Sequence, residues 1–296
     1  MMQNRLLSVV IPTYDRDIDV LRRSIESVLA QDYDAIEIIV VDDNPDDNAY
    51  SHAIRTYCDQ LPNVTYVKQD GNQGACAARN LGIHISRGGY IGFLDDDDIW
   101  EPEKAARQIE RFTADTVGMV FCKGLLVDQN DNTIKPYYNA NYFREKIEHQ
   151  DLLVHDCIGT TSQAIVRREC FDRCGYFNEL LPARQDYEMW LRISREYEIV
   201  GVDAFLFRHC HHQNGQISRN HKKSLAGYKM VYKLHKHDFK RVKKGRRNMV
   251  LHIVKSAKRS KALGDYLKYG LLYLWINPAV LIKTPYRLLL KLLGAA

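Results

Sequence analysis

Short apolar runs that end in polar residues most restrict how this chain of 296 residues can fold. Residues 6–11 and 36–41 are rich in Val, Ile and Leu, and each run has the length of one buried strand. Between them, apolar residues recur at helical spacing over 20–29. A strand, a helix and a second buried strand predict a unit of parallel sheet covered by a helix.

The same alternation continues along the chain. We expect helices over 46–60 and 74–87, and strands over 64–67 and 90–94. Further on, we expect strands at 117–127, 160–166 and 199–207, a helix at 186–195, and a loop or insertion at 128–158. Strands that alternate with helices predict an α/β fold.

Polar side chains gather where the predicted strands end. Thr13 to Arg16 follow the first strand, Asp42 and Asp43 follow the second, and Asp95 to Asp98 follow the strand at 90–94. In open α/β sheets, ligands bind beyond the carboxyl ends of the strands. The sequence therefore predicts a polar ligand site at this edge of the sheet.

The four consecutive aspartates, Asp95 to Asp98, are its sharpest feature. Adjacent carboxylates repel one another, and a hard divalent cation offsets that charge. The alternative is a solvated acidic turn that caps the helix after Pro102. A metal site is favoured because an apolar strand precedes the aspartates and Ile99 and Trp100 follow them.

Two common phosphate-binding motifs are absent from the sequence. There is no GxxxxGK[ST] segment, and the first strand ends in PTYDR where a dinucleotide fold carries GxGxxG. P-loop enzymes and ordinary NAD-binding proteins are therefore excluded. A nucleotide held through a metal ion remains.

Charge is distributed unevenly along the chain. Residues 219–296 contain 20 Lys and Arg against two acidic residues, a balance of +18, whereas residues 1–218 have a balance of −13. Basic residues crowd 222–261, and Leu, Tyr and Trp crowd 266–293, as in an amphipathic segment that binds an anionic membrane surface. The alternative is a packed helical mini-domain with solvated lysines. Nucleic acid is not an expected partner, since no recognition module accompanies the charge.

The expected location follows from three absences. The seven cysteines form no CxxC pair, the N-terminus enters a strand without a leader, and the longest apolar run, 270–282, is too short to span a bilayer. We expect a cytoplasmic protein that sits peripherally on the inner face of the cell membrane.

Six ordered blocks over residues 6–218 resemble the family-2 glycosyltransferases of the GT-A fold, of the bacterial surface-polysaccharide type. The blocks are SVVIPTYDR at 8–16, ESVLAQ at 26–31, IVVDDN at 39–44, ARNLG at 78–82, YIGFLDDDDIW at 90–100 and QDYEMWL at 185–191. The resemblance implies a Rossmann-like, mixed, mostly parallel sheet flanked by helices, in a domain at 1–218 with a nucleotide-sugar half (1–100) and an acceptor and catalytic half (101–218). The charge pattern predicts that a basic, helical, membrane-associating tail at 219–296 follows it.

The resemblance also assigns roles to residues of the polar edge. It implies that the nucleotide of a UDP-sugar is bound by Pro12, Thr13, Tyr14, Arg16, Asp42, Asp43, Arg79, Asp95 and Asp96. Mn²⁺ or Mg²⁺ would be bound by Asp97, Asp95 and His212, with one residue of uncertainty in register because all four positions are Asp. The cation would stabilise the departing nucleoside diphosphate.

Asp186 matches the family's catalytic base, which takes the proton of the acceptor hydroxyl during an inverting displacement. Its neighbour Gln185 departs from the usual Glu, and a helix N-cap is the alternative role of Asp186. The His and Cys residues of 208–218 are too tightly spaced for a tetrahedral zinc site. There, His212 is favoured over His211 as the residue that touches the metal or diphosphate.

The predicted reaction is metal-assisted transfer of a sugar from a UDP-sugar to a hydroxyl of a glycan or lipid-linked acceptor in polysaccharide biosynthesis. Two alternatives stay open: a nucleotidyltransferase-like enzyme, and a sugar-nucleotide-binding protein without transfer activity. The sequence lacks the glycine-rich, basic loop after the first strand that is typical of nucleotidyltransferases. In a binding protein without transfer activity, Asp186 would have no catalytic role.

Overall fold

The computed structural model describes residues 5–45, 48–128, 131–210 and 220–280. The chain forms two compact units. The sheet unit contains 1–149, 156–179 and 185–213, and the helical unit contains 150–155, 180–184 and 214–296. Two short segments that we expected in the first domain therefore pack with the C-terminal helices instead.

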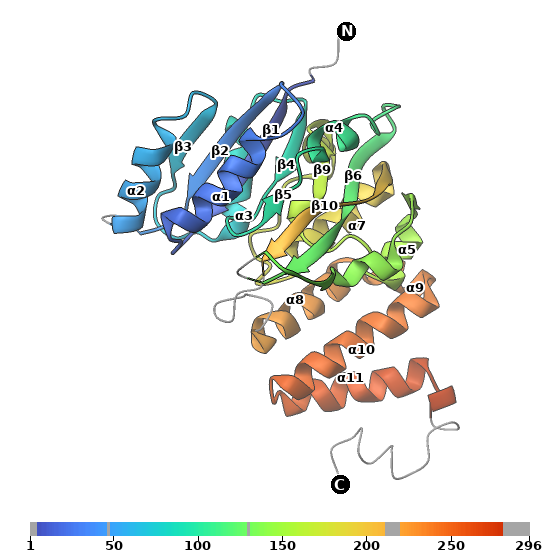
Figure 1. Cartoon of the computed structure of the whole chain (residues 1–296). Coiled ribbons are helices and arrows are strands. Elements are labelled where there is room, and N and C mark those ends of the chain that lie inside the picture. The colour runs from blue at the N-terminus through green and yellow to red at the C-terminus, as the bar shows by residue number, and fades with distance from the viewer. Residues whose placement is uncertain (1–4, 46–47, 129–130, 211–219, 281–296) are drawn as a thin grey trace. The chain divides into compact units, whose positions relative to one another are not determined.

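The sheet unit is built on one mixed sheet with the strand order β3-β2-β1-β4-β9-β6-β10-β5 (Figure 1). Its strands are β1 (Leu7–Thr13), β2 (Ile36–Asp42), β3 (Val64–Lys68), β4 (Tyr90–Phe93), β5 (Ile99–Trp100), β6 (Val117–Val127), β9 (Ala164–Arg167) and β10 (Glu198–Cys210). The β3-β2-β1-β4 half is parallel, as is the long β6-β10 ladder, while β9 runs antiparallel to both of its neighbours. This arrangement confirms the predicted fold class.

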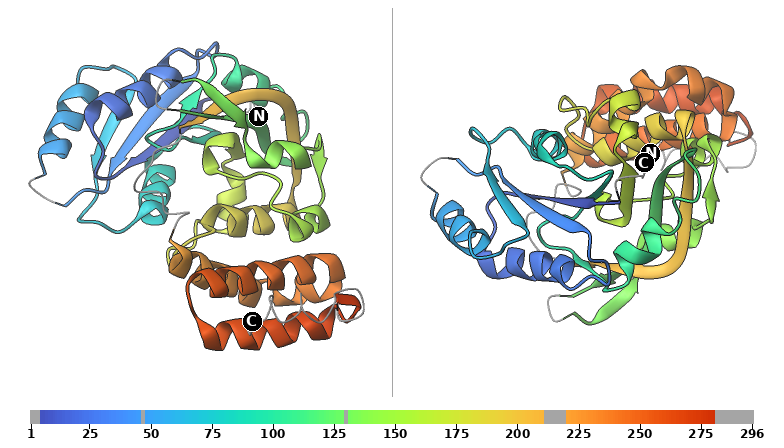
Figure 2. Two further views of the ribbon diagram at one scale, coloured as in Figure 1. Left: turned by 60° about the horizontal axis from the view of Figure 1, so that its bottom comes forward. Right: turned by 90° about the horizontal axis from the view of Figure 1, so that it is seen from above.

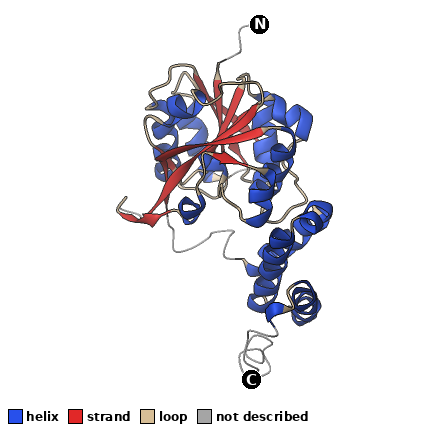
Figure 3. Ribbon diagram, turned by 90° about the vertical axis from the view of Figure 1, so that its right-hand side faces the viewer, coloured by secondary structure: helices blue, strands red, loops and turns tan. Residues whose placement is uncertain are grey.

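Helices cover both faces of the sheet (Figure 3). They are α1 (Ile18–Leu29), α2 (Ala49–Cys58), α3 (Ala75–Ile85), α4 (Lys104–Ile109), α6 (Glu169–Cys174) and α7 (Gln185–Glu196). Helix α1 begins where the Asp17 side chain accepts a hydrogen bond from the Asp19 backbone N–H, and it buries Leu21 and Ile25. Gly82 lets α3 approach β1, since a Cβ there would lie 2.3 Å from the Val10 side chain.

The segment expected as a loop at 128–158 contains short elements. They are β7 (Thr133–Pro136), a 3₁₀ turn η1 (Tyr138–Tyr142), β8 (Lys146–Ile147) and α5 (His149–Val154). Strands β7 and β8 pair with β6 and β10. Such short strands depend on the partner strand and carry little periodicity of their own, which explains why the sequence pattern missed them.

Two further differences lie at the start of β9 and along β10. The strand expected from residue 160 begins at Ala164, after a 3₁₀ turn η2 (Thr161–Gln163). Strand β10 is long and bent (Figure 2), with register shifts against β6 between Val202 and Phe207. The bend carries its end back to the polar edge, where Phe207 and Arg208 pair with β5.

The helical unit contains α8 (His221–Leu234), α9 (Lys236–Arg241), α10 (Lys243–Arg259) and α11 (Leu263–Ile276). Helix α10 packs against α8, α9 and α11, and it buries Met249, Val250 and Ile253. None of the helices in the described part of the chain is long and apolar enough to cross a bilayer.

Candidate active site

The carboxyl ends of β1, β2 and β3 are joined by backbone hydrogen bonds. Asp43 N–H donates to the Thr13 carbonyl at 2.9 Å, and Gln69 N–H donates to the Asp42 carbonyl at 2.9 Å. The predicted nucleotide residues of the first two strands therefore lie in one row, and Gln69, which the sequence analysis did not single out, continues that row.

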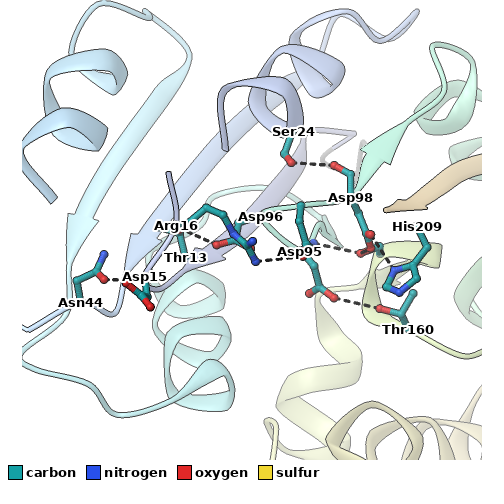
Figure 4. Close-up of polar contacts among 12 residues, drawn as sticks. Thr13, Asp15, Arg16, Ser24, Asn44, Asp95, Asp96, Asp98, Thr160 and His209 are labelled. Carbon is teal, nitrogen blue, oxygen red and sulfur yellow. Dashed lines mark hydrogen bonds and ion pairs between the residues drawn. The ribbon is translucent and has the colours of Figure 1, made fainter. Parts of the chain in front are cut away.

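The four aspartates lie in the turn between β4 and β5, and Figure 4 shows the partners of Asp95, Asp96 and Asp98. Asp96 accepts a hydrogen bond from the Thr13 hydroxyl at 2.8 Å and pairs with Arg16 at 2.9 Å. The same Arg16 pairs with Asp97 at 3.0 Å. Arg16 therefore ties the end of β1 to the centre of the aspartate turn.

Asp95 faces the other way, toward α3. Its carboxylate pairs with the Arg79 guanidinium at 2.6 Å and accepts hydrogen bonds from the Thr160 and Thr161 hydroxyls. Burial opposes ionisation, but Arg79 holds the pKa of Asp95 below its usual value. Asp95 is therefore a carboxylate anion at neutral pH.

Asp98 is completely buried and holds the turn in place. Its carboxylate accepts from the Ser162 hydroxyl at 2.6 Å and contacts His209 Nδ1 at 2.8 Å, and its carbonyl accepts from Ser24. Burial disfavours the imidazolium, but Asp98 outweighs burial and raises the pKa of His209 to about 9. His209 lies in the stretch weighed as a zinc site, yet the sequence carried no signal that paired it with Asp98.

The donor set of the turn suits a hard divalent cation. Burial, together with Asp98 and Asp96, raises the pKa of Asp97 to about 8, and a cation would offset that repulsion. Among the described residues, no three His, Cys, Asp or Glu side chains surround one point. Carboxylate oxygens are the ligands that Mg²⁺ and similar hard cations prefer, so the donor chemistry of this turn fits such a cation.

Two arginines with buried Nε atoms also fit an anionic ligand. In the described part of the chain, the Nε atoms of Arg16 and Arg79 are buried and have no hydrogen-bond partner. A buried N–H without a partner costs free energy unless a ligand satisfies it. Both guanidinium groups flank the aspartate turn, so a diphosphate beside that turn would satisfy them.

The row at β1, β2 and β3 offers groups for a nucleobase. Asp42 accepts from Asn44 and Tyr66, while Asp43 accepts from the backbone N–H groups of Gln73 and Gly74 at 2.7 and 2.8 Å. Both carboxylates therefore shape the surrounding loops. Beside them Gln69 is 4% exposed, and its amide nitrogen and oxygen have no partner among the described residues.

Pro12 and Tyr14 flank Thr13 at the end of the same row. Pro12 lies within β1, opposite Val41, and is half-buried. Tyr14 is 48% exposed, which leaves its ring open to a ligand.

Asp186 lies in the first turn of α7, one residue after Gln185 begins the helix. Burial opposes the charge on Arg79, but Asp95 and, more weakly, Asp186 raise the pKa of Arg79. The Asp186 carboxylate therefore lies within electrostatic range of the guanidinium with which Asp95 pairs.

Tyr137 adds an aromatic side chain that the sequence analysis missed. Its ring packs edge-on against Phe207 and His209. Burial, followed by the carboxylates of Asp98 and Asp186, raises its pKa, so the phenol stays protonated. It follows β7, in the segment expected as an insertion, where no local pattern marked it.

The predicted metal residue His212 lies outside the described residues.

Known proteins resemble this chain in sequence. Residues 8–175 match the family described as glycosyl transferase family 2. A protein of Escherichia coli named as a colanic acid biosynthesis glycosyl transferase, WcaA, is 31% identical over 82% of this chain and 86% of its own length. An uncharacterized glycosyltransferase of Methanocaldococcus jannaschii is 28% identical over 77% of this chain and 78% of its own.

Solved structures share the fold at low identity. The mannosyltransferase PcManGT from Pyrobaculum calidifontis, in complex with GDP-Man and Mn²⁺, superposes with a TM-score of 0.64 at 18% identity, covering 99% of this chain and 85% of its own. TarS 1–349 of S. aureus, in complex with UDP-GlcNAc, superposes with a TM-score of 0.61 at 18% identity, covering 98% of this chain and 79% of its own.

Proposed function

The chain belongs to glycosyl transferase family 2 and has the GT-A fold, and from this premise we propose that it moves a sugar from a UDP-sugar to a hydroxyl of a glycan or lipid-linked acceptor. One observation carries the proposal. Asp95 of the aspartate turn pairs with the buried Arg79, and the charge of Asp186 also acts on that guanidinium, so we place the donor diphosphate and the activated acceptor oxygen near Arg79. The similarity to WcaA supports a role in polysaccharide biosynthesis.

The nucleotide is proposed to lie along the row from Thr13 to Gln69. Asp43 can accept the ring N–H of uracil, and the exposed ring of Tyr14 can pack against the base. Arg16 and Arg79 face the diphosphate with their free Nε–H groups. Support for a sugar-nucleotide donor comes from TarS and PcManGT, which bind UDP-GlcNAc and GDP-Man.

A divalent cation, Mn²⁺ or Mg²⁺, is proposed to bind Asp97 and Asp95, with His212 as a further ligand. When bound, it would supply Lewis-acid stabilisation of the leaving diphosphate. The chain's own residues prepare the site: Arg79 keeps Asp95 ionised, and Asp98 fixes the turn through Ser162 and His209.

Asp186 is proposed to accept the proton of the acceptor hydroxyl while that oxygen attacks the anomeric carbon from the face opposite the diphosphate. A single displacement of this kind inverts the anomeric configuration. A positioned base contributes about 10²–10⁴-fold. The variant Asp186→Asn should therefore lose turnover on that scale and keep its affinity for UDP.

Release of UDP from a panel of UDP-sugars, with and without glycan acceptors, tests this proposal. Asp19→Asn is the matched control, because Asp19 is 79% exposed on α1. Near wild-type turnover in Asp186→Asn would show that Asp186 only caps α7. UDP binding without release by the wild type would favour a non-catalytic binder. Release of sugar 1-phosphate, the leaving group when the nucleotidyl group of the UDP-sugar is transferred, would favour a nucleotidyltransferase.

The metal is tested separately by calorimetry of UDP with and without Mn²⁺. Asp97→Ala should abolish the Mn²⁺ effect, with Asp115→Ala, 86% exposed, as its control. Undiminished Mn²⁺-dependent affinity in Asp97→Ala would remove Asp97 as a ligand. Asp98→Ala is a poor comparison, because Asp98 is buried and its replacement would remove the carboxylate that pairs with His209.

The proposed membrane partner has its own support in the helical unit. Leu263, Leu267, Leu271 and Trp275 recur at every fourth residue of α11 and are 50 to 72% exposed, which makes one apolar stripe. With the +18 balance of residues 219–296, this stripe suits the inner, anionic face of a cell membrane.

The intrinsic fluorescence of Trp275 provides the test. Of the three tryptophans, Trp100 and Trp190 are buried, so emission changes on adding vesicles report Trp275. A blue shift with anionic but not zwitterionic vesicles, lost in Leu267→Gln/Leu271→Gln, is expected. No shift with either vesicle would leave the helices as a packed mini-domain.

A further inference from the structure

The segment 180–184 is held by the helices of the helical unit. Leu181 is 2% exposed and Ala183 is 6% exposed. A Cβ at residue 227 would lie 2.4 Å from the Ala183 carbonyl oxygen, so α8 reaches this segment because residue 227 is glycine. The segment is therefore anchored by its apolar side chains and by close backbone contact.

A stack of three side chains anchors the end of the same segment. The Arg184 guanidinium lies over the Tyr228 ring of α8, 4.5 Å from its centroid. His252 of α10 also stacks on Tyr228, with ring centroids 5.1 Å apart and 17° between the planes. A cation over an aromatic ring is attracted to the electron-rich face of the ring.

The His252 ring is neutral at physiological pH, which suits its place beside a cation. Burial, followed by the positive charges of Arg184 and Lys255, lowers the pKa of His252 to about 4. A neutral imidazole can stack on Tyr228 without repelling Arg184. The stack therefore contains one cation and two neutral rings.

Arg184 also has an unusual backbone conformation. Its φ is +67°, in the left-handed region that non-glycine residues rarely adopt. Such a conformation costs about 1–3 kcal/mol and persists only where the surroundings hold it. The contacts of the Arg184 side chain with α8 supply that support. They hold the backbone turn directly before α7, which begins at Gln185 and carries Asp186 as its second residue.

We propose that Arg184, Tyr228 and His252 form a clamp that fixes the backbone directly before α7 and so positions Asp186 for catalysis. The inference rests on the proposed role of Asp186 as base. A base must lie within hydrogen-bond reach of the acceptor hydroxyl, and a displacement of about 1 Å can cost 10²-fold in rate. The three clamp residues touch neither substrate nor reacting atoms, so they are positioning residues.

The first experiment needs no substrate. Backbone hydrogen exchange in the full chain is followed by mass spectrometry for wild type, Tyr228→Ala and Tyr228→Phe. Peptides covering 182–188 should exchange at least tenfold faster in Tyr228→Ala, whereas peptides covering 40–45 should not change. Tyr228→Phe keeps the ring and should match the wild type. Unchanged exchange at 182–188 in Tyr228→Ala would overturn the clamp.

The second experiment measures the consequence for turnover. Tyr228→Ala should lower kcat for UDP release by at least tenfold while the KM for the UDP-sugar and the affinity for UDP stay within twofold. Arg184→Gly, which tolerates a positive φ but removes the guanidinium, should do the same and covers the case in which Tyr228→Ala does not fold. An equal loss of UDP affinity and kcat would mean a general structural defect and would refute the clamp.

Asp186→Asn, measured in parallel, separates this inference from the proposed function. Loss of turnover in Asp186→Asn with full turnover in Tyr228→Ala and Arg184→Gly would sink the clamp alone. Full turnover in Asp186→Asn would refute the proposed role of Asp186 as base, and with it the inference that the clamp positions a base.

Discussion

Replacement of Arg79 by methionine should destabilise the protein through the carboxylate that it leaves behind. The Arg79 side chain is 11% exposed, pairs with Asp95 at 2.6 Å and packs over the Phe177 ring. Methionine keeps much of the packing volume but removes the charge. Asp95 then remains in the site without its main counter-ion.

The size of the effect follows from burial. Breaking a fully buried ion pair costs about 3–5 kcal/mol, and because Asp95 is 29% exposed we expect about 2–3 kcal/mol here. For a domain of this size the midpoint of thermal unfolding should fall by about 4–12 °C. Arg79→Met/Asp95→Asn removes both charges and should recover most of this loss.

The pH dependence has a definite sign. In the wild type, Arg79 lowers the pKa of Asp95, so the pair stabilises the fold at neutral pH and this contribution is lost in acid. In Arg79→Met the pKa of Asp95 should rise, and the variant loses stability as pH rises. The difference between wild type and variant should therefore be smaller at pH 5 than at pH 7.

Chemical unfolding of the wild type, both single variants and the double variant at the two pH values gives the coupling free energy. A loss below about 0.5 kcal/mol in Arg79→Met, the scale of a solvated surface pair, would refute the reasoning. So would a double variant that is no more stable than Arg79→Met.

Two more predictions concern buried polar groups. Burial lowers the pKa of Lys104 to about 8, and its ammonium lies over Trp100. The Lys104→Met variant should therefore be about 1–2 kcal/mol more stable than the wild type at pH 7, and this gain should shrink as the pH rises from 8 toward 10.5. A gain that urea unfolding finds equal at both pH values would contradict this. The Gln69→Leu variant should have a higher unfolding midpoint but bind UDP about tenfold more weakly in calorimetry. Gln73→Leu, at an exposed position of the following loop, should change neither quantity, and unchanged UDP affinity in Gln69→Leu would exclude the Gln69 amide from the nucleobase site.

The sequence by itself determined the elements whose patterns are local. The strand expected at 117–127 has those bounds in β6, and the helix expected at 186–195 lies within α7. The apolar runs at 6–11 and 36–41 became β1 and β2, and their polar ends share one edge. Burial of a continuous apolar run needs no knowledge of distant partners, which is why composition and spacing were sufficient there.

Only the tertiary structure distinguished the four aspartates from one another. They are identical in sequence, yet Asp95 pairs with Arg79 of α3, Asp96 with Thr13 and Arg16, and Asp98 with His209 at the end of β10. Each role comes from a partner brought in by another part of the chain, and the strength of the interaction depends on burial that the sheet creates. The same holds for residues 180–184, whose contacts with α8 come from far along the chain. Long-range contacts of this kind leave no local pattern, so the fold had to be seen before the roles could be assigned.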